Sequence, residues 1–351
     1  MYDVAIVGAG PAGANLARII GEKYKVLLID KRDLDRDNYR LSKCCGGLLA
    51  PDSQKMIVRL GLGIPKSILV DPQLFAVRTI DLQTNIERLY QRHYYNMDRE
   101  KFDRWLVSLI PSQVDKSFNS VFKGFTETQG GYEVKYVCNG KEVSKKTKVL
   151  VGADGANSKL RRLIYGNENT PKTYISIQEW FECTTPSSYY TAIFDEQISD
   201  FYSWIIPKDN YILLGSALKP KEDAKEKFTL LKEKLTLYGF DFENKVKTEG
   251  SFIYRPKRIS QLQGGKDNVA LIGEAAGAIS PSSAEGISYA LRTSLYLAEC
   301  LNEGMEDFLP RYAKRLNKIK QNILIKNAKC PFMFNPTLRH LAMKSGLQSI
   351  N

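Results

Sequence analysis

The N-terminal residues 1–13 constrain the fold more than any other part of the chain. Residues 2–7 form a short apolar run with β-branched side chains, which is typical of a buried parallel strand and too short for a buried helix. Glycines then follow at the spacing G-x-G-x-x-G, which permits a tight turn, close approach of the backbone to a pyrophosphate, and packing of the next helix on the strand. Unpaired N–H groups at that helix N-terminus favour anions. The residues predicted to hold the phosphates are Gly8, Gly10, Pro11, Ala12 and Gly13.

A second apolar run, residues 25–29, ends in Asp30 about twenty residues after the first glycine. An acidic side chain at this position can accept hydrogen bonds from a ribose. Lys31 and Arg32 follow it directly and belong to the predicted cofactor site. Strand, turn, helix, second strand and acid are all in order, so a dinucleotide site is favoured over a glycine turn in another kind of α/β domain. The glycines alone do not separate FAD from NAD.

The length of 351 residues suits about two domains. The sequence begins directly on the predicted strand, without the features of a secretory signal, and has no run of about eighteen apolar residues that could span a bilayer. Its six cysteines include no C-x-x-C pair and no histidine at ligand spacing, which predicts reduced cysteines and no metal site. We therefore expect a cytoplasmic protein.

The chain is strongly basic, with a net charge of +12. Such a charge attracts polyanions. Because no nucleic-acid-binding motif accompanies the charge, phosphorylated ligands and anionic lipids are favoured as partners over nucleic acid. A generally basic surface without a dedicated partner is the alternative.

Basic residues concentrate near the C-terminus, where residues 311–329 contain seven of them and no acidic residue. Tyr312, Leu316, Ile319 and Ile323 form one apolar stripe opposite these charges. The pattern is typical of a basic amphipathic helix on an anionic membrane, which would bring the protein to the inner face of the membrane. A helix that packs the same stripe on the domain core is at least as good an explanation.

Local patterns predict further elements between the two ends. Residues 51–60 and 98–110 have the apolar spacing of helices, whereas residues 31–40 form a polar loop. Asn139 and Gly140 predict the turn of a β-hairpin. Segments near 68–95 and 174–252 are rich in strand-forming residues, and a parallel-strand signal returns at residues 268–272.

Two later segments bear on the cofactor. Residues 152–161 resemble the D-G-x-x-S-x-x-R segment, and residues 273–281 the G-D-A-A-x-x-x-x-P segment, of the FAD-dependent hydroxylase and geranylgeranyl reductase superfamily. The resemblance implies FAD as the cofactor, with a helix after the second segment whose N-terminus points at the flavin. Glu274 stands where this superfamily usually has aspartate. The alternative for Asp154 and Arg161 is a structural ion pair. The further cofactor residues that the resemblance implies are Asp154, Gly273, Glu274, Gly286 and Ile287.

With FAD implied, the expected fold is α/β: a Rossmann-like FAD-binding domain with an inserted, mainly antiparallel substrate domain and a C-terminal helical segment. A ligand crevice is expected between the two domains. The predicted FAD-binding domain comprises residues 1–67, 96–170 and 255–310, the substrate domain residues 68–95 and 171–254, and the basic helical segment residues 311–351.

Residues 43–47, Lys-Cys-Cys-Gly-Gly, resemble the K-x-C-G-G element of geranylgeranyl reductases. The resemblance places the family's active-site cysteine at Cys45 and brings Gly46 and Gly47 to the flavin. A small buried residue packed against the flavin is the alternative for Cys45. Arg99 matches a superfamily arginine that contacts FAD, and a solvent-facing arginine at a helix start is its alternative.

Residues 202–207, Tyr-Ser-Trp-Ile-Ile-Pro, resemble the Y-x-W-x-F-P segment that lines the lipid tunnel of these reductases. Tyr202, Trp204 and Pro207 are therefore expected to line a substrate site, with plain core packing as the alternative. Ile206 departs from the usual phenylalanine, and Ser199 stands where a proline is usual. Segments 42–54, 91–111 and 273–291 are similar to the CbrA group of bacterial flavoproteins, a similarity that extends over nearly the whole chain.

These resemblances imply an FAD-dependent oxidoreductase that reduces carbon–carbon double bonds of an isoprenoid or prenyl lipid, with Cys45 as proton donor or relay. Residues 202–207 also resemble the W-x-W-x-I-P segment of flavin halogenases, so a halogenase or a monooxygenase for a small aromatic or apolar molecule is the competing enzyme class. A third hypothesis is a non-catalytic, membrane-associated flavin-binding protein. Because no second G-x-G-x-x-G with a preceding strand is present for a nicotinamide, the identity of the external electron donor stays open.

Overall fold

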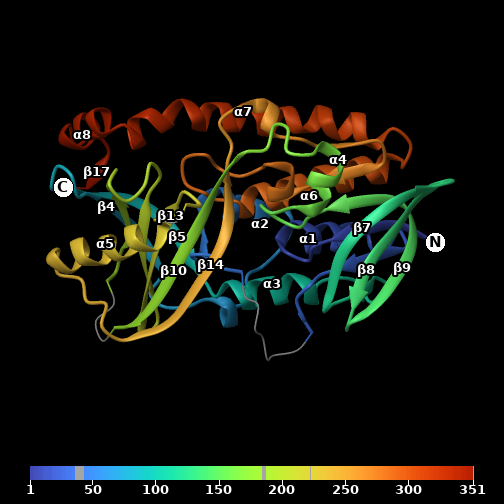
Figure 1. Cartoon of the computed structure of the whole chain (residues 1–351), viewed down its shortest axis with the longest axis horizontal. Coiled ribbons are helices and arrows are strands. Elements are labelled where there is room, and N and C mark those ends of the chain that lie inside the picture. The colour runs from blue at the N-terminus through green and yellow to red at the C-terminus, as the bar shows by residue number, and fades with distance from the viewer. Residues whose placement is uncertain (36–42, 184–186, 222, 351) are drawn as a thin grey trace.

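The structure, a computed structural model, describes residues 1–35, 43–183, 187–221 and 223–350. The molecule is elongated, with the N-terminus at one end of its long axis and the C-terminal residues near the other (Figure 1). One β-sheet forms each half, and long helices run beside the sheets. Part of the predicted polar loop, from residue 36 onward, lies outside the described residues.

The first sheet has the predicted N-terminal strand in its centre. Strand β1 (Tyr2–Val7) pairs in parallel with β2 (Val26–Ile29) on one side and with β9 (Lys141–Gly152) on the other. The strand order is β15-β16-β9-β1-β2-β6, and β7 and β8 extend it from β9 in antiparallel fashion. The predicted turn at Asn139 and Gly140 is confirmed between β8 and β9, where both residues have positive φ. The other strands are β6 (Asp115–Ser117), β7 (Ser120–Thr128), β8 (Gly131–Cys138), β15 (Gly265–Lys266) and β16 (Val269–Leu271).

Helices cover this sheet and extend beyond it. Helix α1 (Pro11–Ile20) follows the glycine turn and packs against α3 (Arg99–Ser108) and α6 (Ile287–Glu303). Helices α2 (Pro51–Arg59) and α7 (Phe308–Phe334) also pack on α6. The helices predicted at 51–60 and 98–110 are confirmed as α2 and α3. The remaining helical elements are η1 (Lys66–Ile68), α4 (Lys159–Tyr165), α5 (Ala224–Leu237), η2 (Ile259–Gln261), η3 (Gly273–Ala276) and α8 (Pro336–Lys344).

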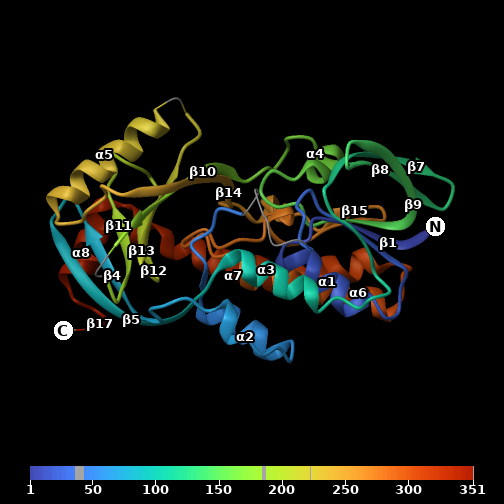
Figure 2. The ribbon, with the colours of Figure 1, turned by 90° about the horizontal axis from the view of Figure 1, so that it is seen from below.

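The second sheet has the order β14-β10-β13-β12-β11-β4-β5-β17 and is mainly antiparallel, with a parallel pairing of β11 and β4. One face packs under α5, and the other packs against the end of α7. Figure 2 shows α5 beside these strands, at the end of the molecule where the chain ends. The strands are β3 (Leu48–Leu49), which pairs with β5, β4 (Leu74–Asp81), β5 (Ile86–Asn96), β10 (Lys172–Glu182), β11 (Tyr190–Phe194), β12 (Ser203–Lys208), β13 (Tyr211–Leu218), β14 (Lys245–Arg255) and β17 (Ser349–Ile350).

The apolar stripe of the C-terminal segment faces the core. Tyr312, Leu316, Ile319 and Ile323 are all buried, and the Tyr312 hydroxyl donates to the Leu271 carbonyl at 2.9 Å. The idea that this stripe lies on a membrane is therefore wrong, because an amphipathic helix presents the same pattern to a protein core. Among the described residues, no helix is long and apolar enough to cross a membrane.

The segment is also less purely helical than expected. Helix α7 begins at Phe308, before the predicted start of the segment, and α8 is followed by the short strand β17, which pairs with β5. The end of the chain is thereby tied to the second sheet.

Candidate active site

A cavity of about 1470 Å³ is lined by residues of both sheets and of the C-terminal helices. A single small-molecule pocket usually has about 300–1,000 Å³, so this cavity has room for a cofactor and a substrate together. All but two of the predicted site residues line it: Gly13 and Pro207 do not. Those that do are Gly8, Gly10, Pro11, Ala12, Asp30, Lys31, Arg32, Cys45, Gly46, Gly47, Arg99, Asp154, Tyr202, Trp204, Gly273, Glu274, Gly286 and Ile287.

The glycine turn forms a cradle at one end of the cavity. A Cβ on Gly8, which has a φ of +106°, would lie 2.4 Å from the Ala153 carbonyl oxygen, and a Cβ on Gly13 would lie 1.8 Å from the Gly8 oxygen. Gly13 therefore serves helix–turn packing rather than ligand contact. A Cβ on Gly10 would meet no heavy atom closer than Arg32 Nη2, at 4.0 Å. Gly10 is also the N-cap of α1, where no side chain caps the helix, so this end of the cavity suits a pyrophosphate.

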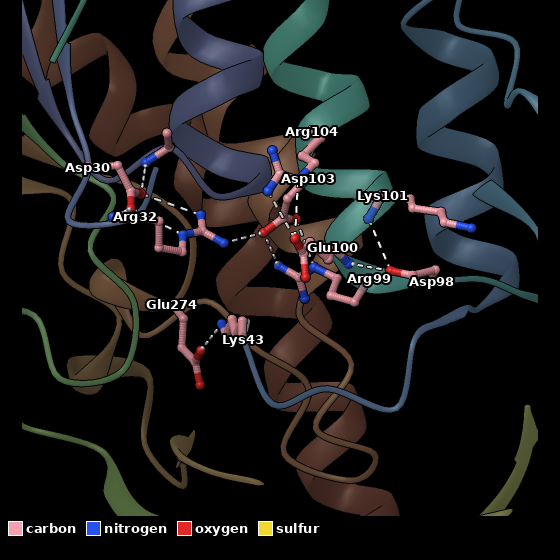
Figure 3. Close-up of polar contacts among 11 residues, drawn as sticks. Asp30, Arg32, Lys43, Asp98, Arg99, Glu100, Lys101, Asp103, Arg104 and Glu274 are labelled. Carbon is pink, nitrogen blue, oxygen red and sulfur yellow. Dashed lines mark hydrogen bonds and ion pairs between the residues drawn. The ribbon is translucent and has the colours of Figure 1, made fainter. Parts of the chain in front are cut away.

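A buried charge cluster of Asp30, Arg32, Asp103 and Arg99 lies beside the cradle (Figure 3). Asp30 Oδ2 accepts from the Ala9 N–H at 2.6 Å, and its Oδ1 accepts from Arg32 Nε at 3.1 Å. Arg32 Nη1 and Arg99 Nε both donate to Asp103, at 2.7 and 2.8 Å. The protein thus fixes the orientation of Asp30, whereas its contact with a ribose stays a prediction.

Asp103 is the member of this cluster that sequence reasoning missed. Burial alone would raise its pKa, but Arg99 and Arg32 outweigh burial and hold that pKa below its ordinary value. Burial likewise opposes the charge of Arg99, yet Asp103 and Cys45 keep the Arg99 pKa above its ordinary value. The spacing from Arg99 to Asp103, one turn along a helix, was a usable signal. Arg99 is buried and not the solvent-facing arginine of the alternative.

Glu274 connects the two halves of the site. Its Oε1 accepts from the backbone N–H of Tyr254 on β14 at 2.9 Å, and its Oε2 lies 3.4 Å from Lys43 Nζ (Figure 3). The carboxylate is mostly buried, and it lies on the cavity wall. Its contact with the cofactor stays a prediction.

Asp154 and Arg161 have separate structural roles. Asp154 accepts from the backbone N–H of Lys159 at 2.8 Å and from the Ser158 hydroxyl, so it holds the start of α4. Arg161 donates to the carbonyls of Ala275 and Gln261, which ties the two superfamily segments together. No ion pair between Asp154 and Arg161 occurs in the described part of the chain, so the ion-pair alternative is wrong.

Helix α6 begins at the cavity wall, with Gly286 and Ile287 among the lining residues. Glu285 already occupies part of its N-terminus, because Glu285 Oε1 accepts from the Ser288 N–H at 2.7 Å. The positive end of this helix dipole is therefore partly neutralised by the protein itself.

The loop of residues 43–47 carries two cysteines in different environments. Cys45 is partly exposed and lines the cavity, and its Sγ accepts from the Gly47 N–H at 3.5 Å. Cys44 is buried against Ser176, and burial raises the pKa of its thiol to about 12. Cys45 is the better placed of the two to act on a bound molecule.

Lys208 holds this loop through hydrogen bonds, and it was not among the site residues predicted from the sequence. Its Nζ donates to the carbonyls of Gly47, at 3.1 Å, and Met97, at 2.8 Å. Burial lowers the pKa of Lys208 to about 7. The lysine directly follows the Tyr202–Pro207 segment, and a lysine that ends a fully buried strand was the available signal.

The side chains of β12 alternate between the two faces of the second sheet. Tyr202, just before the strand, and Trp204 and Ile206 within it line the cavity. Pro207 shares the opposite face with Ile205, which packs under α5. The prediction that Pro207 lines the substrate site is therefore wrong, because a strand presents only every second residue to one face.

A glycine turn of the nucleotide-binding type and a second, mainly antiparallel sheet share one cavity, which is the architecture of a nucleotide-binding protein with a separate substrate-binding sheet. The FAD binding domain family matches residues 1–324, and the chain therefore belongs to this family, with FAD as its cofactor. It is an FAD-dependent oxidoreductase of that superfamily.

The chain is 40% identical to the protein CbrA of Escherichia coli K12 over 99% of its own length and 98% of the relative. A solved geranylgeranyl bacteriochlorophyll reductase-like protein from Thermoplasma acidophilum has a TM-score of 0.81 at 18% identity, covering 97% of this chain and 90% of that one. A probable FAD-dependent monooxygenase from Pseudomonas aeruginosa has a TM-score of 0.70 at 18% identity, covering 98% and 99%. At such identities these two structures establish the shared fold alone.

Proposed function

We propose that the protein reduces carbon–carbon double bonds of an isoprenoid or prenyl-lipid substrate. Bound FAD, once reduced by an external electron donor, supplies a hydride. The alkene gains this hydride at one carbon and a proton at the other, so it takes up two electrons and two protons in all. An isolated alkene needs the proton because it is not activated for hydride attack alone.

Cys45 is the proposed proton donor. Its thiol borders the cavity, and the guanidinium of Arg99 interacts with it. When the S–H bond breaks and the proton goes to the substrate carbon, Arg99 compensates the negative charge that remains on sulfur. Solvent then returns the proton to the thiolate.

The cavity wall beyond Cys45 supports an apolar substrate. Tyr202 and Trp204 contact each other with ring centroids 5.4 Å apart, and Phe194 continues this aromatic wall. Arg92 and Lys329 line the same cavity and suit a phosphate head group. The observation that carries the proposal is that the glycine turn, Cys45 and the aromatic face of β12 share one cavity.

The test is product analysis after incubation of the reduced holoprotein with a polyprenyl phospholipid. Without oxygen, we expect a product heavier by two hydrogens for each reduced double bond, seen by mass spectrometry. A product that contains oxygen and forms only in air would instead support a monooxygenase. Absence of both products would overturn the proposed reaction on this lipid and leave two alternatives, chemistry on a small apolar molecule and a non-catalytic flavin-binding protein.

A second candidate, oxygen-dependent or halogenating chemistry on a small apolar molecule, is favoured by one observation. Flavin halogenases, whose W-x-W-x-I-P segment residues 202–207 resemble, need a lysine near the site, and Lys43 lies on the cavity wall next to Glu274. Incubation with bromide or chloride and oxygen, followed by a search for halogenated product, separates this candidate from the reductase.

A further inference from the structure

The outer face of α7 changes character along its length. Its first half presents Lys314 and Lys318 to solvent, and its second half presents Leu324, Ile325 and Phe332. These three apolar side chains are 54%, 59% and 58% exposed. Lys318, Ile325 and Phe332 recur at seven-residue spacing, so they follow one line along the helix surface. Large apolar side chains that are exposed close together on a protein surface usually mark a site that binds another molecule.

Further exposed apolar side chains lie on the last elements of the chain. Leu341 on α8 and Leu347 after it are also exposed, and α8 packs against α7. Figure 1 shows α7 along one long edge of the molecule, with α8 at its far end. We call these exposed apolar side chains of α7, α8 and the residues after α8 the C-terminal apolar face: Leu324, Ile325, Phe332, Leu341 and Leu347.

The segment of residues 311–350 carries positive charge and no negative charge of its own. Residues 311–350 contain nine lysines and arginines and no aspartate or glutamate. Arg311, Arg315, Lys326 and Arg339 pair with carboxylates of other elements, whereas four lysines are exposed: Lys314, Lys318, Lys329 and Lys344. Lysines flanking exposed apolar side chains are the composition of a surface that binds anionic lipid: the apolar groups enter the acyl boundary, and the lysines meet the phosphates. A second protein chain would not require such a uniform sign of charge.

The cavity reaches the same surface. Lys329, Phe332, Ala342 and Gln348 all line it, and Lys329, Phe332 and Ala342 are exposed at the same time. A molecule that leaves the acyl layer next to Phe332 would therefore pass directly to the aromatic wall of the cavity.

We propose that the C-terminal apolar face docks the protein on an anionic membrane, with the mouth of the cavity turned toward the lipid. This differs from the stripe at Tyr312, which is buried. The docking itself is independent of the reaction, whereas delivery of substrate from the membrane rests on the proposed function.

Co-sedimentation of the FAD-loaded full chain with vesicles tests the docking. We expect the protein to sediment with an equal mixture of phosphatidylcholine and phosphatidylglycerol, and not with phosphatidylcholine alone. A Leu324→Ser, Ile325→Ser double variant should bind the mixed vesicles at least tenfold more weakly. Lys314→Gln with Lys318→Gln should weaken binding several-fold and reduce its dependence on salt.

Leu237→Ser is the matched control, because Leu237 is 91% exposed on α5, which packs on the face of the second sheet opposite the end of α7. It should sediment like the wild type. Equal binding to neutral vesicles, no binding, or an equal loss in the Leu237 variant would overturn the docking proposal. So would a dimer in vesicle-free solution that Leu324→Ser, Ile325→Ser converts to a monomer, since a second copy would then cover the face.

The assay contains no turnover, so the two proposals can fail separately. Reduction of a detergent-solubilised prenyl lipid by a protein that ignores vesicles would leave the reaction standing and remove the docking. Vesicle binding without any reduction of the lipid would support the docking and remove the proposed reaction.

Discussion

At the glycine-turn end of the cavity the charged side chains bind one another, whereas at the β12 end two buried polar atoms lack partners among the described residues. Asp30, Arg32, Asp103 and Arg99 form a continuous chain of ion pairs. Trp204 Nε1 and Gln178 Oε1, by contrast, are buried without a hydrogen bond. The first end is therefore organised before any ligand arrives, and the second is left incomplete by the protein.

The geometry of the second sheet explains why Trp204 Nε1 and Gln178 Oε1, at the β12 end of the cavity, have no hydrogen-bond partner within the ranges that the structure describes. Gln178 and Trp204 lie in register on either side of Gly215. A Cβ on Gly215 would lie 2.3 Å from Trp204 Nε1, so the indole covers the glycine between the two polar side chains. The comparison teaches that fixed charge dominates where the cofactor is predicted, while shape and apolar surface dominate where the substrate is expected.

The largest expected effect is at the cradle. Gly10→Val should abolish FAD binding, because its side chain would occupy the space that the pyrophosphate needs. Flavin absorbance per chain measures this. Gly63→Val is the control, since a Cβ on Gly63 meets nothing within 4 Å and the residue lies outside the cavity. Stoichiometric flavin in the Gly10 variant would show that the cradle is misassigned.

Cys45 lies where the two ends meet. Cys45→Ser should keep FAD and lose at least about a hundredfold in turnover of a prenyl lipid, because a hydroxyl is a much weaker acid than a thiol. Turnover is measured under the anaerobic conditions described above. Cys138→Ser, outside the cavity, should behave like the wild type. Wild-type turnover in the Cys45 variant would make this cysteine structural.

Asp103→Asn breaks the ion-pair chain and should lower the free energy of unfolding by about 3–5 kcal/mol, since it leaves two buried arginines short of a counter-charge. Denaturant unfolding measures this. The control on the same helix is Glu100→Gln, which removes the more exposed pair with Arg104 and should cost less than about 1 kcal/mol. If both variants lowered the free energy of unfolding equally, the buried cluster would stabilise the fold no more than an exposed ion pair does.

Lys208→Met should change how stability depends on pH. The folded pKa of Lys208, about 7, lies below its ordinary value of 10.5, so between these two pH values the unfolded chain binds a proton that the folded chain does not. The free energy of unfolding of the wild type therefore rises with pH in this window, by up to about 1.4 kcal/mol per pH unit. The variant should lose this component. Identical slopes in urea unfolding from pH 7 to 10.5 would contradict the assignment.

The smallest effect is expected at the incomplete end. Trp204→Phe should change the free energy of unfolding by less than about 1 kcal/mol, because lost contact over Gly215 is offset by removal of a buried N–H without a partner. Thermal and urea unfolding check this. A loss as large as that of Asp103→Asn would mean that the Trp204 N–H is satisfied in the folded protein.

Local signals predicted the fold well where chain neighbours decide it. The strand before Gly8, the turn at Asn139 and Gly140, and helix α2 each follow from residues next to one another in sequence. The C-terminal stripe shows the limit, because burial against a core and burial in lipid demand the same spacing. Only the packing of Tyr312 on the first sheet separates the two.

Most residues that the sequence motifs predicted for the site line the cavity, but the motifs did not predict the contacts that hold those residues in place. The Tyr202–Pro207 motif, taken as one unit, predicts that Pro207 lines the site, although alternation along a strand turns this residue away from the cavity. Asp103 and Lys208 act through partners such as Arg32 and Met97, which are distant in sequence. Local spacing could point to Asp103 and Lys208 themselves, but these long-range partners are set by tertiary structure and are not revealed by composition or spacing.

Native mass spectrometry of the full chain with FAD and a polyprenyl phospholipid tests most directly whether the two ends of one cavity hold two molecules at once. The account predicts a complex of one chain, one FAD and one lipid, and loss of the FAD component in Gly10→Val. Displacement of FAD by the lipid, or lipid binding that never coexists with flavin, would contradict it.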